Sequence, residues 1–152
     1  MGRQSQSVGD LVVASNFIRA VRESGYLSLS TALAELIDNS LQAGAAAVEI
    51  SLRRPEGSPF PEIEVLDNGS GMDRRELEQC LRFGGSSRFG QRESFGRFGM
   101  GLPAASLSQA RRVEVVAWQH DGPELEVALD VDAIAESGAA PLRARRVGPS
   151  GT

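Results

Sequence analysis

The chain has 152 residues, of which 41% are hydrophobic and 24% are charged, an ordinary composition for one soluble globular domain. A net charge of -4 argues against a nucleic-acid surface built on bulk positive charge, and leaves open whether a local patch binds nucleic acid. The single cysteine, Cys80, excludes an internal disulfide framework, and the absence of an apolar run of about eighteen residues argues against a membrane span. These features predict a cytoplasmic protein.

Two helices are expected at the start of the chain. Apolar residues recur with a helical period from Leu11 to Glu23. A second helix has a start signal at Ser28 or Ser30, an apolar face, and a stop signal at Gly44, a residue type that readily adopts the positive φ found after many helices. The first part of the chain is therefore expected to be mainly helical.

A hairpin and a third helix are expected next. Apolar and polar residues alternate over 48–52 and again over 63–66, and the stretch between them is rich in proline and glycine, as turns are. Asp73, with Glu76 three positions later, has the pattern of a capping box, which predicts the start of a helix. The order helix, hairpin, helix favours an α+β fold.

The second half of the chain contains a loop, a helix and two strands. Residues 84–98 are rich in Gly, Ser, Arg and Phe without a clear period, which predicts a long irregular loop of the kind that often acts as a lid. A short buried helix is expected over 100–110 and strands over 113–118 and 125–129, with Trp118 in the core. The remaining C-terminal residues show little pattern. Together these elements predict an α+β two-layer sandwich, with helices on one face of a mixed, mostly antiparallel sheet.

Glu35 and Asn39 are four residues apart on the second helix, so their side chains lie one above the other on the same face. A carboxylate can orient a water molecule and take its proton, and an amide oxygen can bind a hard cation such as magnesium. The pair therefore indicates a general base beside a metal ligand. The alternative is a solvated helix face, because polar pairs at this spacing are common.

The sequence DNGSGM, at residues 67–72, directly follows the second strand of the hairpin. The carboxylate of Asp67 can accept a hydrogen bond from a ligand amino group, and Gly69 and Gly71 let the backbone turn sharply or approach a flat ligand. The alternative is an ordinary Asp-Asn-Gly turn that leads into the next helix.

The sequence GRFGMG, at residues 96–101, lies between the expected lid and the helix that follows it. Glycines at such a junction let consecutive backbone N–H groups face an anion, and the helix N-terminus adds a favourable dipole. Because no strand precedes the motif, it does not have the context of a dinucleotide-binding Rossmann unit.

The order and spacing of ELIDNS, DNGSGM and GRFGMG resemble the N-box and the two glycine boxes of the GHKL, or Bergerat-fold, superfamily of ATP-binding domains. ELIDNSLQAGAAAVEI is similar to MutL, while LRFGGSSR and FGRFGMGLPAAS are similar to the MORC group, in the branch that also holds the heat-shock chaperone. The resemblance covers Leu33 to about Val116. It implies a single ATP-binding domain over 1–152 with a lid over 84–98. By the same resemblance, the chain is an N-terminal fragment of a longer protein, and its domain lacks the last strand of the fold.

The resemblance also implies a role for each matched residue. Glu35 polarises the water that attacks the γ-phosphate of ATP, Asn39 holds Mg²⁺, and Asp67 accepts the adenine amino group. Met72 packs against the adenine ring, and Thr152 matches a threonine that bonds the adenine-reading aspartate. The residues assigned to contacts with ATP besides Asn39 and Asp67 are Gly69, Gly71, Met72, Ser86, Ser87, Arg88, Gly96, Gly99, Met100, Gly101 and Thr152.

By the same resemblance, the chain is an ATPase that uses ATP as a conformational switch and forms a nucleotide-dependent homodimer. A following domain supplies a lysine or arginine to the γ-phosphate. All sixteen basic residues of this chain are arginines, so it has no lysine of its own for this role, and turnover by the isolated domain is expected to be weak or absent. Two alternatives stay open. One is a histidine-kinase-type phosphotransferase, against which Glu35 argues because those kinases usually carry asparagine there, and the other is an ATP-binding module without turnover.

Overall fold

The structure is a computed structural model that describes residues 28–81, 101–137 and 142–147. The helix expected over 11–23 and the lid expected over 84–98 lie outside these residues. The described helices are α2 (Leu29–Gln42), α3 (Arg74–Cys80), α4 (Gly101–Gln109) and α5 (Val131–Ser137). The described strands are β1 (Val48–Arg53), β2 (Glu62–Asp67), β3 (Arg112–Ala117), β4 (Leu125–Asp130) and β5 (Arg145–Arg146). None of these helices is both long enough and apolar enough to cross a membrane.

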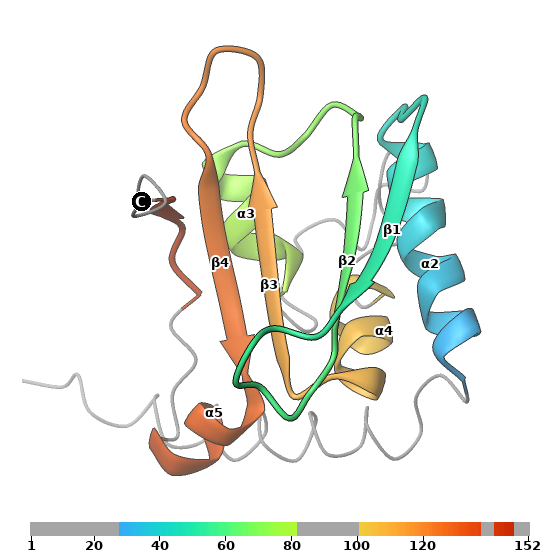
Figure 1. The fold of residues 1–152 in the computed structure, drawn as a ribbon. Coiled ribbons are helices and arrows are strands. Elements are labelled where there is room, and N and C mark those ends of the chain that lie inside the picture. Colours follow the sequence, from blue (N-terminus) through green and yellow to red (C-terminus); the bar gives the residue numbers. More distant parts are fainter. Residues whose placement is uncertain (1–27, 82–100, 138–141, 148–152) are drawn as a thin grey trace, which may run out of the picture.

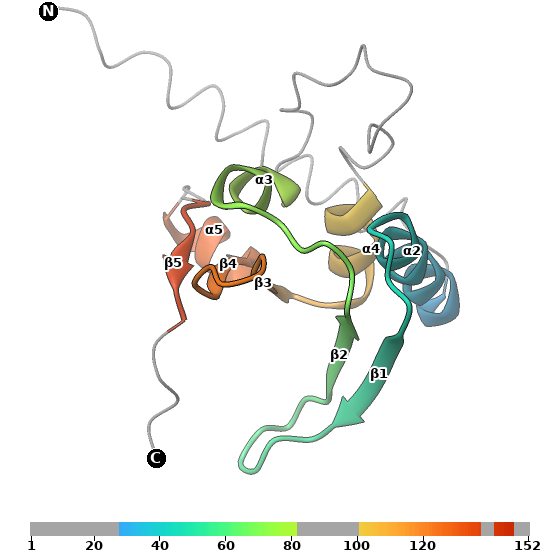
Figure 2. The same cartoon turned by 90° about the horizontal axis from the view of Figure 1, so that it is seen from above.

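Helices α2, α3 and α4 lie on one side of the strands, as Figure 1 and Figure 2 show from two directions. The described strands form two antiparallel sheets, with the orders β1-β2 and β3-β4-β5. The α+β fold class, with helices over antiparallel strands, is therefore confirmed. The described strands do not form the single mixed sheet that was expected, because β2 and β3 are not hydrogen-bonded to each other. That the chain lacks the last strand of this fold stays a prediction.

Helix α2 begins and ends where its sequence predicts. The hydroxyl oxygen of Ser28 accepts a hydrogen bond from the backbone N–H of Thr31 at 3.2 Å, which satisfies one of the free donors in the first turn. Just after the last turn, Gly44 has a φ of 75°, a conformation that glycine adopts at little cost. Local interactions therefore define both ends of α2, the helix that carries Glu35, Asn39 and Ser40.

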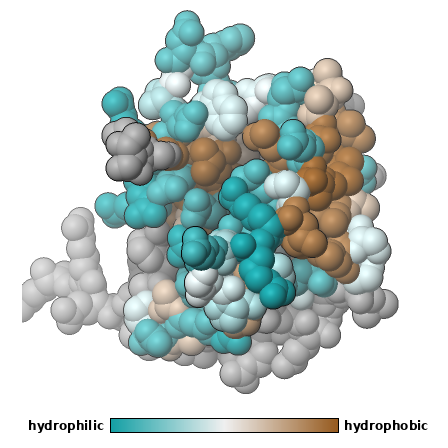
Figure 3. Space-filling model, viewed as in Figure 1, coloured by the Kyte–Doolittle hydropathy of each residue, from teal (hydrophilic) through white to brown (hydrophobic). Residues whose placement is uncertain are grey.

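The register of the β1–β2 hairpin places its apolar residues, all but Leu66, on one face, because directly paired residues point to the same side. The pairs on this face are Val48 with Asp67, Ile50 with Val65, and Leu52 with Ile63. Exposure is high near the turn of the hairpin, where Leu52 on β1 and Phe60 in the connection to β2 are 71% and 70% exposed. Figure 3 shows the apolar surface that gathers over β1 and β2. At the other end of the same face, the strand directs the carboxylate of Asp67 toward α2.

The hydrophobic core lies between α3, α4, α5 and the sheet formed by β3, β4 and β5. β4 alternates buried and half-buried residues, as a strand does when one of its faces covers a core. At the start of α3, Asp73 and Glu76 form the expected capping box. Trp118, which was expected in the core, is 41% exposed because it lies just beyond the end of β3. The buried core residues in the described part of the chain are Leu77, Leu81, Leu107, Val113, Ala117, Leu125, Val127, Leu129, Ile134, Leu142 and Ala144.

Two C-terminal elements, α5 and β5, are not predicted by the sequence pattern. Helix α5 starts after Asp130, whose Oδ1 accepts a hydrogen bond from the backbone N–H of Asp132 at 2.9 Å. Next to β5, the backbone N–H of Ala144 donates to a carboxylate oxygen of Glu78 on α3, also at 2.9 Å. A contact between residues far apart in sequence, together with pairing to β4, therefore positions β5.

Burial raises the pKa of the Cys80 thiol from 9.0 to about 12. A thiol whose pKa is higher in the folded than in the unfolded chain contributes stability in full below pH 9.0, and loses it as pH rises toward about 12. The reason is that, between these two pH values, the Cys80 thiol ionises readily only when the chain is unfolded. From this thiol alone, we expect the free energy of unfolding to fall by up to about 1.4 kcal/mol per pH unit.

Urea unfolding of the chain and of Cys80→Ala, at about pH 8 and about pH 10, measures this effect. Other groups titrate equally in both proteins, so the difference in stability between them isolates the thiol. The advantage of the wild-type chain should shrink at the higher pH. An advantage of the same size at both pH values would show that the thiol is not shielded from water.

Candidate functional site

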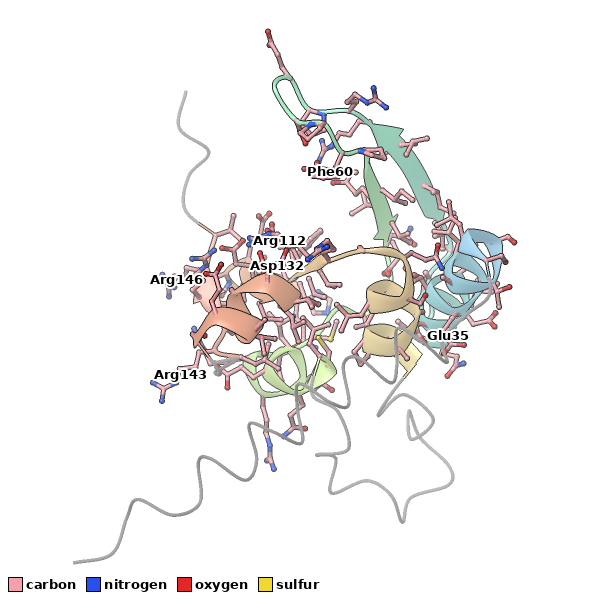
Figure 4. The ribbon with its side chains drawn as sticks, turned by 90° about the horizontal axis from the view of Figure 1, so that it is seen from below. Glu35, Phe60, Arg112, Asp132, Arg143 and Arg146 are labelled. Atoms are coloured by element: carbon pink, nitrogen blue, oxygen red, sulfur yellow. The ribbon has the colours of Figure 1, made fainter. Side chains whose placement is uncertain are left out.

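The carboxylate of Glu35 lies against the N-terminus of α4, where α2 and α4 pack together (Figure 4). A Cβ atom added at Gly101 would be 2.2 Å from Glu35 Oε1, so glycine leaves the room that this carboxylate occupies. The free N–H groups and the positive dipole end of a helix N-terminus favour an anion there. Glu35 is half-buried, so the alternative of a solvated helix face does not describe it.

The side-chain oxygen of Asn39 is buried one turn further along α2, and no donor among the described residues hydrogen-bonds to it. Leaving a buried acceptor unsatisfied costs on the order of 1–3 kcal/mol, which a ligand or a cation can offset. No group of three or more His, Cys, Asp or Glu side chains in the described ranges could hold a metal ion. A cation here would therefore bind Asn39 together with ligand oxygens and water, as Mg²⁺ commonly does.

The carboxylate of Asp67, at the end of β2, is held at both of its oxygens. Oδ1 accepts a hydrogen bond from the backbone N–H of Gly69 at 2.9 Å, and Oδ2 accepts one from the hydroxyl of Ser40 at 2.8 Å. Sequence reasoning missed Ser40, although a serine on the otherwise apolar face of α2 was a signal for a buried polar contact. The bond joins α2 to β2 and orients the carboxylate.

Asn68 is a second residue that sequence reasoning missed, and it ties the loop after β2 to the segment between α2 and β1. Its side-chain oxygen accepts hydrogen bonds from the backbone N–H groups of Ala46 and Ala47, at 2.8 and 2.9 Å. In the same loop, the N–H of Ser70 donates to the carbonyl of Ala43 at 2.9 Å. The loop therefore keeps its position relative to α2 through its own contacts.

The glycines of this loop are required by close approaches within the protein. A Cβ atom at Gly69 would come within 2.9 Å of Ala43. Gly71 has a φ of +67°, and a Cβ atom there would come within 1.9 Å of the carbonyl oxygen of Trp118. Met72, the next residue, packs partly buried against the core. These contacts fix the loop against both α2 and the end of β3.

The described residues with an assigned role lie on α2, at the end of β2, in the loop that follows β2, and at the start of α4. They are Glu35, Asn39, Asp67, Gly69, Gly71, Met72 and Gly101. The other assigned residues lie outside the described part of the chain: Ser86, Ser87, Arg88, Gly96, Gly99, Met100 and Thr152. The site has a helix N-terminus and an unsatisfied amide oxygen at one end and an oriented carboxylate at the other. It suits a ligand with an anionic group and, some distance away, a hydrogen-bond donor.

Residues 27–148 match the profile of a family described as "Histidine kinase-, DNA gyrase B-, and HSP90-like ATPase". The chain is 27% identical over 113 residues to the DNA mismatch repair protein MutL of Pediococcus pentosaceus, covering 72% of this chain and 17% of that protein. It is 33% identical over 106 residues to MutL of Rhizobium johnstonii, covering 65% and 17%. Protein MICRORCHIDIA 7 of Arabidopsis thaliana is 29% identical over 79 residues, covering 50% and 11%. The chain thus spans less than a fifth of the length of these relatives.

Proposed function

Because the chain belongs to the family of histidine kinase-, DNA gyrase B- and HSP90-like ATPases, we propose that it binds Mg-ATP and hydrolyses it to ADP and phosphate as a conformational switch. The observation that carries this proposal is the position of Glu35, half-buried against the N-terminus of α4 and one turn from the unsatisfied oxygen of Asn39. The carboxylate is thereby held beside a helix N-terminus that suits an anion and an amide oxygen that suits a cation.

The base of ATP is proposed to bind at the end of β2. The carboxylate of Asp67 accepts a hydrogen bond from the adenine amino group, and its orientation is supported by Ser40 and Gly69. Met72 packs against the ring from the loop that follows, and Gly71 keeps this loop close to β3. In this arrangement the base is recognised by a group that the protein holds in place before the ligand arrives.

The phosphates are proposed to bind at the start of α4, where Gly101 lets the backbone come close. Asn39 is the protein ligand for Mg²⁺, which when bound offsets the charge of the phosphates. Glu35 orients a water molecule and takes its proton as the water oxygen bonds to the γ-phosphorus. The bond between this phosphorus and the oxygen that bridges it to the β-phosphate breaks, which releases ADP and phosphate.

The remaining contacts of the site are also proposals, and they rest on the resemblance. The lid over 84–98 closes on the phosphates, which Ser86, Ser87 and Arg88 contact. Gly96 and Gly99 serve as hinges of the lid and give N–H groups to the phosphates, and Met100 also contacts the nucleotide. Thr152 supports the adenine-reading aspartate. Nucleotide binding brings two copies of the chain together, and a following domain adds a basic residue to the γ-phosphate. Lid closure and pairing are how ATP would act as a switch.

A histidine-kinase-type phosphotransferase and an ATP-binding module without turnover are the competing functions. Both would use the same base pocket, so ATP binding alone does not separate them from an ATPase. A glutamate held beside the start of α4 favours hydrolysis, because a base that activates water is needed only when water is the phosphoryl acceptor.

Calorimetric titration of the 152-residue chain with ATP tests the proposal, once with Mg²⁺ and once with excess chelator. We expect one ATP per chain and tighter binding with Mg²⁺, because the cation would satisfy the oxygen of Asn39 and the phosphates together. Circular dichroism establishes that the titrated chain is folded. A folded chain that binds no ATP would contradict the proposal.

A further inference from the structure

Ser40 is the one polar or charged side chain classed as buried in the described part of the molecule, with 4% of its surface exposed. Its hydroxyl oxygen lies 2.8 Å from Asp67 Oδ2 and 3.2 Å from the carbonyl oxygen of Leu36. A hydroxyl has a single hydrogen to donate, and a bond to a carboxylate is shorter and stronger than a bond to a neutral carbonyl. The contact with Asp67 is therefore the principal one.

Among the described residues, two donors hold the Asp67 carboxylate, one at each oxygen. The backbone N–H of Gly69 donates to Oδ1, and the hydroxyl of Ser40 donates to Oδ2. Bonds at both oxygens fix the rotation of the carboxylate plane. Each oxygen can still accept another hydrogen bond, so a ligand donor has to approach from a direction that Ser40 and Gly69 leave free.

We propose that Ser40 is a positioning residue that sets the base specificity of the nucleotide site, an inference that rests on the proposed function. Adenine carries an amino group where hypoxanthine carries a carbonyl oxygen. A carboxylate held at that position accepts a hydrogen bond from the amino group and repels the carbonyl oxygen. Without the bond from Ser40, Asp67 rotates more freely and turns away from the carbonyl, so the two bases are distinguished less well.

The test measures the Kd values of ATP and of ITP, whose base is hypoxanthine, by calorimetry with the wild-type chain, Ser40→Ala and Ser108→Ala. Ser108 is a matched control, because its hydroxyl donates within helix α4, to the carbonyl of Ala105 at 2.7 Å. We expect Ser40→Ala to reduce the preference for ATP over ITP by about tenfold, the lower end of the effect of losing one hydrogen bond to a charged group. Ser108→Ala should keep the wild-type preference.

An unchanged preference in folded Ser40→Ala, when the wild-type chain binds ATP, would overturn the role of Ser40 and leave the proposed function standing. Loss of affinity for ATP and ITP by the same factor would also overturn it, since a purely structural role affects both nucleotides alike. A folded wild-type chain that binds neither nucleotide would overturn both ideas. If Ser40→Ala does not fold, Ser40→Cys keeps the side-chain size with a weaker donor, and a wild-type preference in that variant would overturn the role.

Discussion

Replacing Glu35 by glutamine is expected to slow ATP hydrolysis by about 10²–10⁴-fold, the range that general-base catalysis commonly provides. Glutamine has the same size and still fits against Gly101, but it does not take a proton from water. The affinity for ATP should therefore change little. Single-turnover release of labelled phosphate from γ-labelled ATP measures the effect, and it is sensitive enough for the slow turnover that we expect from this domain.

Asp38→Asn is the matched control for the Glu35 variant. Asp38 carries a carboxylate on the same helix, but it is exposed, whereas Glu35 is half-buried. Its replacement removes the same charge from α2 without touching the start of α4, so hydrolysis should stay close to the wild-type rate. If Glu35→Gln retained wild-type turnover, Glu35 would have no part in the mechanism, and one of the non-hydrolysing functions would be favoured.

Replacing Asp67 by asparagine is expected to weaken ATP binding by at least about 100-fold while the chain stays folded. Loss of a hydrogen bond to a charged group accounts for about 10–150-fold. In addition, the new amide NH₂ faces a donor if it points to the adenine amino group or to the N–H of Gly69, and if it points to Ser40, the hydroxyl has to accept where it now donates. Calorimetric titration with Mg-ATP measures the affinity, and thermal unfolding reports the stability.

Glu64→Gln is the matched control for the Asp67 variant, because it removes a carboxylate from the same strand at an exposed position that faces Arg53. The affinity of this control for ATP should equal that of the wild-type chain, because an exposed ion pair of this kind contributes little. Wild-type affinity in folded Asp67→Asn would show that this carboxylate does not read the base.

Much of the fold could be predicted because its signals are local. The Ser28 cap, the turn at Gly44 and the capping box at Asp73 each depend on residues within a few positions of one another. The strand β5 could not be predicted, since it exists through pairing with β4 and through the bond between Ala144 and Glu78. No pattern in two consecutive arginines indicates a strand.

In the candidate site too, local features could be predicted from the sequence and long-range contacts could not. Spacing alone placed Glu35 and Asn39 on one face of a helix, but it did not distinguish a solvated face from one packed on α4. Ser40 was missed because its partner, Asp67, lies 27 positions away in the sequence. The exposure of Trp118 was missed for a related reason, since an aromatic residue at a strand end has no local signal that separates core from surface.

Helix α2 sets the distance and the angle between the two ends of the site. Glu35 and Ser40 are five residues apart, which corresponds to about 7.5 Å along the helix axis and about 140° around it. The separation of the two carboxylates, one beside α4 and one bonded to Ser40, therefore depends on the number of residues between them. Inserting one residue would turn one end by about 100° relative to the other. This segment should accept substitutions at its exposed positions but no change in length.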